Sequence, residues 1–245
     1  DFINKELLPH LHGLDVDTRT NLPNPAASPK QRIIGRIMTA VERVRVDDEA
    51  NLRDILDRVH EISIDHIDDT HFFTLSQVYE DLLLKMGEKN SDGGQFFTPR
   101  EVIRAMVHTV KPSLGQTVYD PCCGTGGFLA VAYEHIARNL GNVPAATDIE
   151  RLKHSTFFGR EKENLVFPIA LANLVLHGID QPNLWHGNSL TRRATYPALF
   201  QQAPAQFDVI LTNPPFGGKE GKDAQKNFAF ETSATQVLFV QDILA

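Results

Sequence analysis

The sequence has little cysteine, no excess of basic residues and no long apolar run, and each shortage argues against a class of protein. Its only cysteines are the neighbours Cys122 and Cys123. Adjacent cysteines rarely form an unstrained bridge, so we exclude a disulfide framework and expect a reducing, cytoplasmic location. No apolar stretch is long enough to cross a bilayer. The first residue is Asp1 and no charged-then-apolar leader follows it, so we expect no secretion signal.

The charges are unevenly distributed along the chain, whose formal net charge is -7. Residues 1–94 contain 11 Lys and Arg against 18 Asp and Glu, whereas residues 95–245 contain 13 of each. An acidic front part suits a protein-facing domain better than a DNA groove. If the chain handles DNA, we therefore expect a more basic partner to supply much of the contact with phosphate.

The chain is expected to contain two domains. Apolar residues recur at helical spacing early in the sequence, as at Ile33 and Ile37, and strand signals are few there. A polar, glycine-bearing segment at residues 89–94 then interrupts the pattern. We predict a small all-helical domain over residues 1–91, serving packing or docking, and a second domain over residues 92–245.

The second domain alternates between strand and helix. Thr98 is expected to be the N-cap of its first helix, with Pro99 at the first helical position and Glu101 completing a capping box. The alternation implies an α/β fold with an open, mostly parallel, Rossmann-like sheet. Such sheets usually continue past a fourth strand, so we expect a partial domain, truncated at its C-terminal side. The strands are expected near 117–119, 156–159, 184 and 207–211, and the later helices at 128–139 and 167–176.

A glycine-rich turn, DPCCGTGGF at residues 120–128, links the first strand to a helix. Glycines let the backbone approach a ligand, and the helix N-terminus offers free N–H groups. The carboxylate of Asp120 would repel a phosphate and attract a cationic ammonium group, and the lysine of a nucleotide-binding P-loop is absent. A simple tight connection between strand and helix remains the alternative. Cys122 and Cys123 are interpreted as small side chains rather than nucleophiles, because no partner base is evident.

An acid closes the second strand in the run FFGRE, which ends at Glu161. A carboxylate at such a position can accept hydrogen bonds from both ribose hydroxyls of an adenosine group. Asp148 is nearer to the spacing usual in nicotinamide-binding proteins, but it lies in a polar stretch without a strand pattern. We therefore predict that Glu161, rather than Asp148, binds the ribose hydroxyls.

These motifs, followed by TNPPFGG at residues 212–218, resemble the paired signatures of amino-methyltransferases that use S-adenosylmethionine. GQFFTPR at residues 94–100 and LANLVLHGI at residues 171–179 narrow the resemblance. They are similar to the modification subunit of type I restriction-modification enzymes, the N-6 DNA methylases, over residues 72–245. The resemblance implies adenine-specific methylation of double-stranded DNA, with a specificity subunit and a restriction nuclease subunit as partners.

The resemblance also implies a set of site residues, which includes no metal ligand. Glu161 would hold the ribose of S-adenosylmethionine. Family members commonly place an aspartate against the adenine ring after the third strand, where this chain has Asn188, whose amide can still hydrogen-bond an adenine edge. The remaining cofactor-binding residues would be Gln95, Phe96, Phe97, Thr98, Pro99, Arg100, Asp120, Gly124, Thr125, Gly126 and Gly127.

The residues after the last strand suit methylation of an amine. The exocyclic amine of adenine is a poor nucleophile, because its lone pair is delocalised into the ring. The side-chain carbonyl of Asn213 and the backbone carbonyl of Pro214 can accept its hydrogens, and Pro215 helps to fix the extended backbone. Phe216 can stack on a base flipped out of the duplex. The alternative is that the prolines only end the strand and that the phenylalanine belongs to the core.

Other functions remain open at this point. An amino-methyltransferase acting on RNA or protein can use the same acceptor geometry. A nicotinamide oxidoreductase shares the fold but has no use for residues 213–216, and a non-catalytic assembly subunit needs no methyl transfer at all. The loop at residues 217–226 carries three lysines and three glycines, and either is a solvated loop or closes over DNA.

Overall fold

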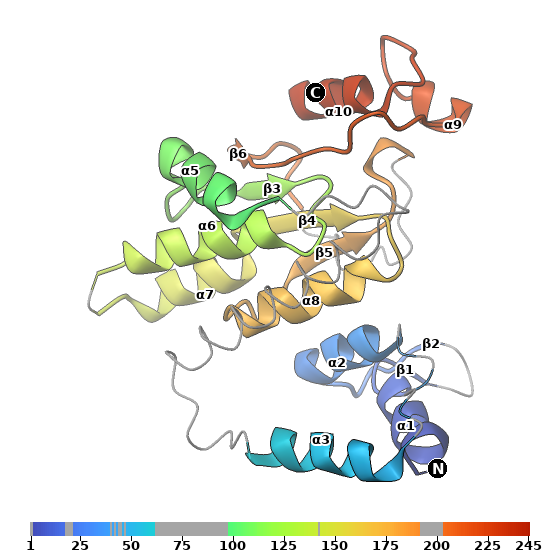
Figure 1. The fold of residues 1–245 in the computed structure, drawn as a ribbon. Helices are drawn as coiled ribbons and strands as arrows, with labels where there is room; N and C mark the ends of the chain where they lie inside the picture. Colours follow the sequence, from blue (N-terminus) through green and yellow to red (C-terminus); the bar gives the residue numbers. More distant parts are fainter. Residues whose placement is uncertain are drawn as a thin grey trace. The chain divides into compact units, whose positions relative to one another are not determined.

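The computed structural model describes residues 2–17, 22–39, 48–61, 98–141, 143–191 and 203–245, together with residues 41, 43 and 46. The chain forms two compact units, Asp1–Val78 and Tyr79–Ala245. The sequence places this boundary later, after residue 91. Both positions lie outside the described residues. Figure 1 shows the elements of each unit.

The first unit contains the helix expected around Ile33 and Ile37, further helices, and a short antiparallel pair of strands that was not expected. Ile33 is buried on α2, whereas Ile55 and Leu56 of α3 remain about half exposed, at 48% and 49%. The elements of this unit are η1 (Ile3–Leu7), α1 (Leu8–His12), β1 (Val16–Asp17), β2 (Leu22–Pro23), α2 (Pro29–Thr39) and α3 (Glu49–Glu61).

The second unit shows the predicted alternation of strand and helix. It also contains a helix, α7, in the polar stretch around Asp148. The last strand of the unit, β6, is shorter than predicted. The elements are α5 (Arg100–Val110), β3 (Val118–Asp120), α6 (Gly127–Arg138), α7 (Ala146–His154), β4 (Phe157–Glu161), α8 (Val166–Leu176), β5 (Asn183–His186), η3 (Ser189–Thr191), β6 (Val209–Ile210), α9 (Lys222–Gln225) and α10 (Thr235–Leu244).

The four strands of this unit form a parallel sheet in the order β5-β4-β3-β6, which confirms the predicted parallel architecture (Figure 1). The chain moves outward from β3 through β4 to β5 and then returns to the other side of β3 for β6. Such a reversal opens a crevice at the carboxyl ends of the strands, where α/β sheets bind their ligands. The candidate site residues follow these strand ends.

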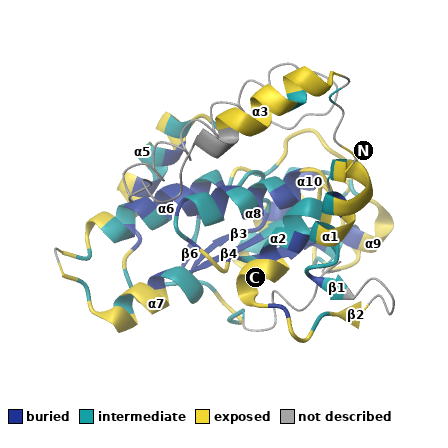
Figure 2. Cartoon of the chain, turned by 90° about the horizontal axis from the view of Figure 1, so that it is seen from below, coloured by how far each residue is buried: buried dark blue, intermediate teal, exposed yellow. Residues whose placement is uncertain are grey.

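The core of the unit lies where the sheet meets α6 and α8 (Figure 2). Leu129 of α6, Leu171 of α8 and Leu184 of β5 are all fully buried. Gly159 of β4 allows this close packing, because a Cβ atom there would lie 2.7 Å from the Leu184 side chain and 3.0 Å from that of Leu129. Packing of this density holds the strand ends in fixed positions.

The start of α5 differs from the prediction. The helix begins at Arg100, and its N-cap is Pro99, with no capping bond from a side chain. The predicted capping box at Thr98 is therefore wrong. Pro99 has a fixed φ of -55° and an extended ψ of 138°, so it already occupies the non-helical cap position, and its carbonyl accepts from the N–H groups of Val102 and Ile103. The Thr98 hydroxyl is thereby left for a distant partner.

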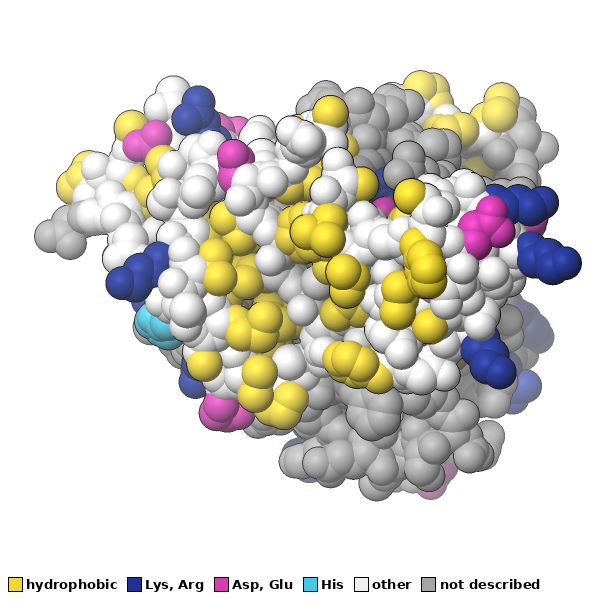
Figure 3. Space-filling model, turned by 90° about the horizontal axis from the view of Figure 1, so that it is seen from above, with side chains coloured by type: hydrophobic (Ala, Val, Ile, Leu, Met, Phe, Trp, Pro, Cys, Tyr) yellow, Lys and Arg dark blue, Asp and Glu magenta, His cyan; other side chains and the backbone are white. Residues whose placement is uncertain are grey.

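Apolar side chains gather on the face of the molecule seen in Figure 3. Near its C-terminal end the chain exposes Phe230, Val240 and Leu244, at 65%, 55% and 80%, while Leu238 and Phe239 of α10 are buried in a cluster with Leu190. Within the described part of the chain, no helix combines the length and the apolar character that crossing a membrane requires.

Candidate active site

The candidate site lies along the carboxyl edge of the parallel sheet. Asp120 ends β3, Glu161 ends β4, Asn188 follows β5, and Asn213 follows β6. These four residues span more than ninety positions of the sequence, and the parallel register brings their backbones to one edge. The other predicted members lie in the loops that connect these strand ends to the following helices.

Asp120 is buried, with 1% of its surface exposed. Its Oδ1 accepts hydrogen bonds from the Cys122 N–H at 3.1 Å and from the Thr212 hydroxyl at 2.7 Å. Burial raises the pKa of this carboxyl group to about 7, although the two hydrogen bonds act in the opposite direction. Both bonds reach the same oxygen, so within the described residues Oδ2 remains available to a ligand. An ammonium group would favour the ionised form.

Glu161 holds the glycine turn from the neighbouring strand. Its Oε2 accepts from the N–H of Gly124 at 2.8 Å, and its Oε1 accepts from the N–H of Glu163 at 2.7 Å. Burial raises the pKa of this carboxyl group, against the effect of these hydrogen bonds. Each carboxylate oxygen keeps a further lone pair. The side chain can therefore accept from two adjacent hydroxyl groups without losing its own anchors.

The glycine turn has the backbone that its sequence predicts. Gly124 and Gly126 have φ values of 55° and 82°, in the left-handed region that glycine enters easily. A Cβ atom at Gly126 would lie 3.2 Å from the Leu174 side chain, whereas one at Gly124 would meet no atom within 4 Å. Gly126 is thus packed against α8, and Gly124 has open space beside it.

Asn173 of α8 contacts the backbone of the glycine turn. It is fully buried, and its Nδ2 donates to the carbonyl of Thr125 at 2.8 Å. Sequence reasoning did not assign this residue a role, although a lone amide within the apolar run VFPIALANLVL was a usable signal. Its buried side-chain oxygen has no hydrogen-bond partner within the described residues.

The two cysteines of the turn are poor nucleophiles. Burial raises the pKa of the Cys122 thiol, and the nearby Asp120 carboxylate raises it further. Burial also raises the pKa of Cys123. The Cys122 Sγ lies 3.0 Å from the Thr212 hydroxyl. The Cys122 and Cys123 side chains are therefore neutral thiols at ordinary pH. The small Cys122 side chain also allows the loop after β6 to approach the turn closely.

The segment after β6 is tied to the rest of the site through its first two residues. Thr212 donates to Asp120, and the Asn213 Nδ2 donates to the Thr98 hydroxyl at 3.1 Å. Because the amide nitrogen is held in this way, the side-chain carbonyl of Asn213 points away from Thr98. Phe216, in contrast, is 72% exposed. It is not part of the core, and its ring is accessible to a planar partner.

Arg100 is anchored away from this segment. Its guanidinium lies 2.8 Å from Glu134 of α6, which also pairs with Arg138 at 3.3 Å, and the His177 Nε2 lies 3.4 Å from the same carboxylate. Burial would raise the pKa of Glu134, but the hydrogen bond from His177 and the two guanidinium groups hold it below its usual value. Arg100, the first residue of α5, thus fastens the start of this helix to α6.

Asn188 is held on both sides of its amide. The Oδ1 accepts from the Leu190 N–H at 2.9 Å, and the Nδ2 donates to Glu220 at 3.1 Å. Sequence reasoning did not identify Glu220, because nothing in a loop of alternating lysines, glycines and acids distinguishes it. Of the other predicted cofactor-binding residues, Gln95, Phe96 and Phe97 lie outside the described residues.

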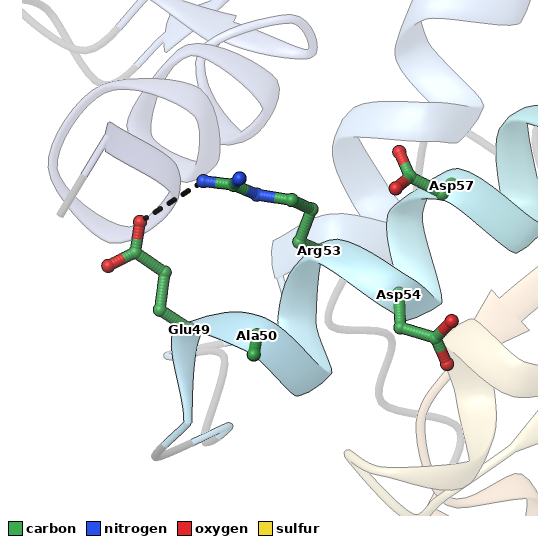
Figure 4. Close-up of a pocket in the computed structure, with 5 residues that line it drawn as sticks. All are labelled: Glu49, Ala50, Arg53, Asp54 and Asp57. Atoms are coloured by element: carbon green, nitrogen blue, oxygen red, sulfur yellow. Dashed lines mark ion pairs between the residues drawn. The ribbon is translucent and has the colours of Figure 1, made fainter.

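A separate hollow lies on α3 in the first unit and is lined by Glu49, Ala50, Arg53, Asp54 and Asp57 (Figure 4). Its lining residues belong to a single helix. Glu49 and Arg53 form an exposed ion pair of 3.6 Å one turn apart, an arrangement typical of a solvated helix surface. None of the candidate site residues borders this hollow.

Comparison with known proteins gives a consistent set of relatives. Residues 71–245 match the family model for N-6 DNA Methylase. The type I restriction enzyme EcoEI methylase subunit of Escherichia coli is 32% identical over 247 residues, which cover 100% of this chain and 46% of that protein. The EcoKI methylase subunit of Escherichia coli strain K12 is 34% identical over 171 residues, 68% of this chain and 32% of that protein.

A solved structure from work on complex assembly and conformational transition of the type I R-M system is also similar. It has a TM-score of 0.76 and 35% identity, over 99% of this chain and 45% of that one. The chain therefore spans about half the length of this structure and of the EcoEI subunit.

Proposed function

Because this chain belongs to the N-6 DNA methylase family, we propose that it carries the active site of a site-specific DNA methyltransferase. The enzyme transfers a methyl group from S-adenosylmethionine to the 6-amino group of adenine in double-stranded DNA. It acts in the cytoplasm as the modification subunit of a type I restriction-modification system. A specificity subunit and a restriction subunit are its partners.

The groups along the sheet edge fit S-adenosylmethionine. The Asp120 carboxylate suits the ammonium of the methionine part, and the Glu161 carboxylate suits the two ribose hydroxyls. The positive φ values at Gly124 and Gly126 and the open space beside Gly124 give the cofactor room beside the turn. A phosphate-bearing dinucleotide would meet the buried Asp120 carboxylate instead, which disfavours the nicotinamide alternative.

S-adenosylmethionine, when bound, supplies an electrophilic methyl group on a positively charged sulfur. The protein's part is to position the target amine and to draw out its lone pair. The side-chain carbonyl of Asn213 and the backbone carbonyl of Pro214 accept hydrogen bonds from the two N–H groups of the amine. With the cofactor bound, the lone pair of the positioned amine would form the bond to the methyl carbon, and the electrons of the broken carbon–sulfur bond would remain on sulfur. The nitrogen then releases one proton to solvent, so no strong base is required.

The observation that carries this proposal is the double attachment of the segment after β6. Thr212 is bonded to Asp120 in the cofactor turn, and Asn213 is bonded to Thr98 beside the segment that the family uses for the cofactor. The segment that carries the Asn213 amide is thus held against the glycine turn before a cofactor or a target base binds, which supports the proposal. Preorganisation of this kind avoids reordering during the reaction. The exposed Phe216 ring is free to stack on an extruded base.

The direct test is Asn213→Ala in the full-length protein assembled with its specificity subunit. We expect a fall in the methylation rate of about a hundredfold or more, the usual effect of removing one preorganised polar contact at the reacting group. Binding of S-adenosylmethionine, measured by calorimetry, stays within about threefold of wild type. Asn139→Ala is the matched control, because Asn139 is exposed at the end of α6 and bonds only within that helix.

The assay offers duplex DNA, RNA and protein to the same complex, with tritium in the methyl group of the cofactor. Labelled N6-methyladenine in duplex DNA supports the proposal. Label in RNA or protein alone would move the function to that substrate. An inactive wild-type complex that still assembles and binds DNA would identify a non-catalytic subunit. Normal turnover by the Asn213 variant would refute the proposed role of the amide.

A further inference from the structure

Glu220 stands on a firmly fastened part of the loop that follows the catalytic segment. Its backbone N–H donates to the carbonyl of Ser233 at 2.9 Å, and its carbonyl accepts from the Gln225 Nε2 at 2.9 Å. The preceding residue, Lys219, forms an antiparallel bridge with Ala234. The backbone therefore determines the direction in which the Glu220 side chain leaves the loop.

That side chain reaches back to two strand ends. Its Oε2 accepts from the Asn188 Nδ2 at 3.1 Å, and its Oε1 lies 3.9 Å from the Lys162 Nζ. Asn188 follows β5, and Lys162 directly follows Glu161 at the end of β4. The side chain of Glu220 is 14% exposed, whereas that of Lys162 is 59% exposed. A pair at this distance with one exposed partner is weak, so the lysine leaves Oε1 able to accept from a ligand.

Asn188 alone is a weak acceptor for an amine. Its side-chain oxygen already accepts from the Leu190 N–H, so only one lone pair of a neutral oxygen remains for a ligand. The edge of adenine presents an amino donor at position 6 and an acceptor at the adjacent ring nitrogen. A carboxylate is a stronger acceptor for the amine than this neutral oxygen, and the carboxylate bonded to Asn188 is that of Glu220.

We propose that Glu220 is a cofactor-binding residue that accepts a hydrogen bond from the 6-amino group of the adenine of S-adenosylmethionine, while Asn188 donates to the adjacent ring nitrogen. The inference rests on the proposed function. It also connects two parts of the site, because Glu220 lies four residues after Phe216 on the same loop. Binding of the cofactor thereby steadies the loop that receives the target base.

The test compares two ligands that differ only at the recognised group. S-adenosylhomocysteine carries the amine, and the analogue whose base is unsubstituted purine carries hydrogen in its place and keeps the same ring nitrogens. Affinities of both are measured by calorimetry for the full-length protein and for Glu220→Gln. Wild type should prefer the adenosyl ligand by about tenfold to a hundredfold, the effect of a hydrogen bond to a charged group. In the variant this preference falls to within about threefold, because the neutral carboxamide oxygen accepts from the amine much more weakly than a carboxylate does.

Two further variants make the test specific. Glu231→Gln is the matched control, since Glu231 is exposed, and it should keep the wild-type preference. Asn188→Asp in the Glu220→Gln background restores a carboxylate at this strand end and should recover most of the preference for the adenosyl ligand. Thermal unfolding without ligand verifies that each variant is folded.

The outcomes separate this inference from its competitors. Equal weakening of both ligands in Glu220→Gln would show that the carboxylate only braces the loop, and tighter binding of both would show that it obstructs the site. An unchanged preference would also overturn the inference. If wild type binds neither ligand, the proposed function fails instead, and the role of Glu220 fails with it.

Discussion

Cofactor binding at this site is expected to depend on pH, because the carboxyl group of Asp120 is buried at the end of β3. Burial raises its pKa to about 7, well above the usual value for an aspartate. Below pH 7 the cofactor-free protein therefore holds a proton that an incoming ammonium group must displace. With a pKa of about 7, roughly one molecule in eleven carries the ionised group at pH 6. Affinity at pH 6 should thus be about tenfold lower than on the alkaline plateau.

Calorimetry between pH 5.5 and 7.5 measures this dependence, below the range near pH 8 in which amino groups themselves titrate. Titrations in two buffers with different heats of ionisation give the number of protons released. We expect nearly one proton per site at pH 6 and less at pH 7.5. Burial also raises the pKa of Glu161, which acts in the same direction. The Asp120→Asn variant should bind more weakly at pH 7.5 and should release fewer protons.

The same pKa makes the folding stability of the cofactor-free chain depend on pH. The folded, cofactor-free chain keeps this proton up to about pH 7, whereas an unfolded aspartate loses it near pH 4. Asp120 therefore contributes to stability below pH 4, and this contribution is lost as the pH rises from about 4 to 7. Asp120→Asn should raise the melting temperature of the cofactor-free chain at pH 8 more than at pH 5. A flat affinity between pH 6 and 7.5, without proton release, would refute the reasoning.

Two further predictions concern the carboxylates that position the site. Glu161→Ala should weaken S-adenosylmethionine binding by about tenfold to a hundredfold, because it removes the ribose acceptor and releases the glycine turn. Calorimetry measures this affinity. Glu163→Ala, at an exposed position, is the control, and an equal loss of affinity in both variants would remove Glu161 from the site. Glu134→Gln should lower the free energy of unfolding by about 3 kcal/mol, since it leaves the half-buried Arg100 charge uncompensated. Arg138→Gln, which removes the exposed partner of the same carboxylate, should change it by less than about 1 kcal/mol in denaturant titrations, and equal effects of the two variants would contradict this account.

The two acids at the strand ends could be predicted because local patterns determine them. A short apolar run that ends in an acid indicates a buried strand with its carboxylate at the edge of the sheet. Asp120 and Glu161 both follow such runs, and both lie at the carboxyl ends of their strands. Asp148 lacks a strand before it, and the structure places it in the first turn of α7.

The contacts that orient the catalytic segment could not be predicted in the same way. Thr98 and Asn213 are separated by 115 residues, and Asn188 and Glu220 by 32. No local periodicity encodes such pairs, because they depend on how the loops lie after the sheet has formed. The wrong prediction at Thr98 has this origin. Its hydroxyl fits a local capping pattern, but Pro99 takes the cap position, and the hydroxyl accepts from the amide of Asn213.

The three loops at the sheet edge are therefore coupled through the loop after β6, which we propose receives the target base. Thr212 binds the turn that would hold the methionine part, Asn213 binds Thr98, and Glu220 binds Asn188 at the adenine side. Every one of these contacts joins the segment after β6 to a part of the cofactor site. A cofactor that occupies the crevice would contact the partners of all three residues at once, and would restrict the same loop at three points. We therefore predict an order of binding: a cofactor that binds first should reduce the conformational freedom that the loop would otherwise lose when the base arrives.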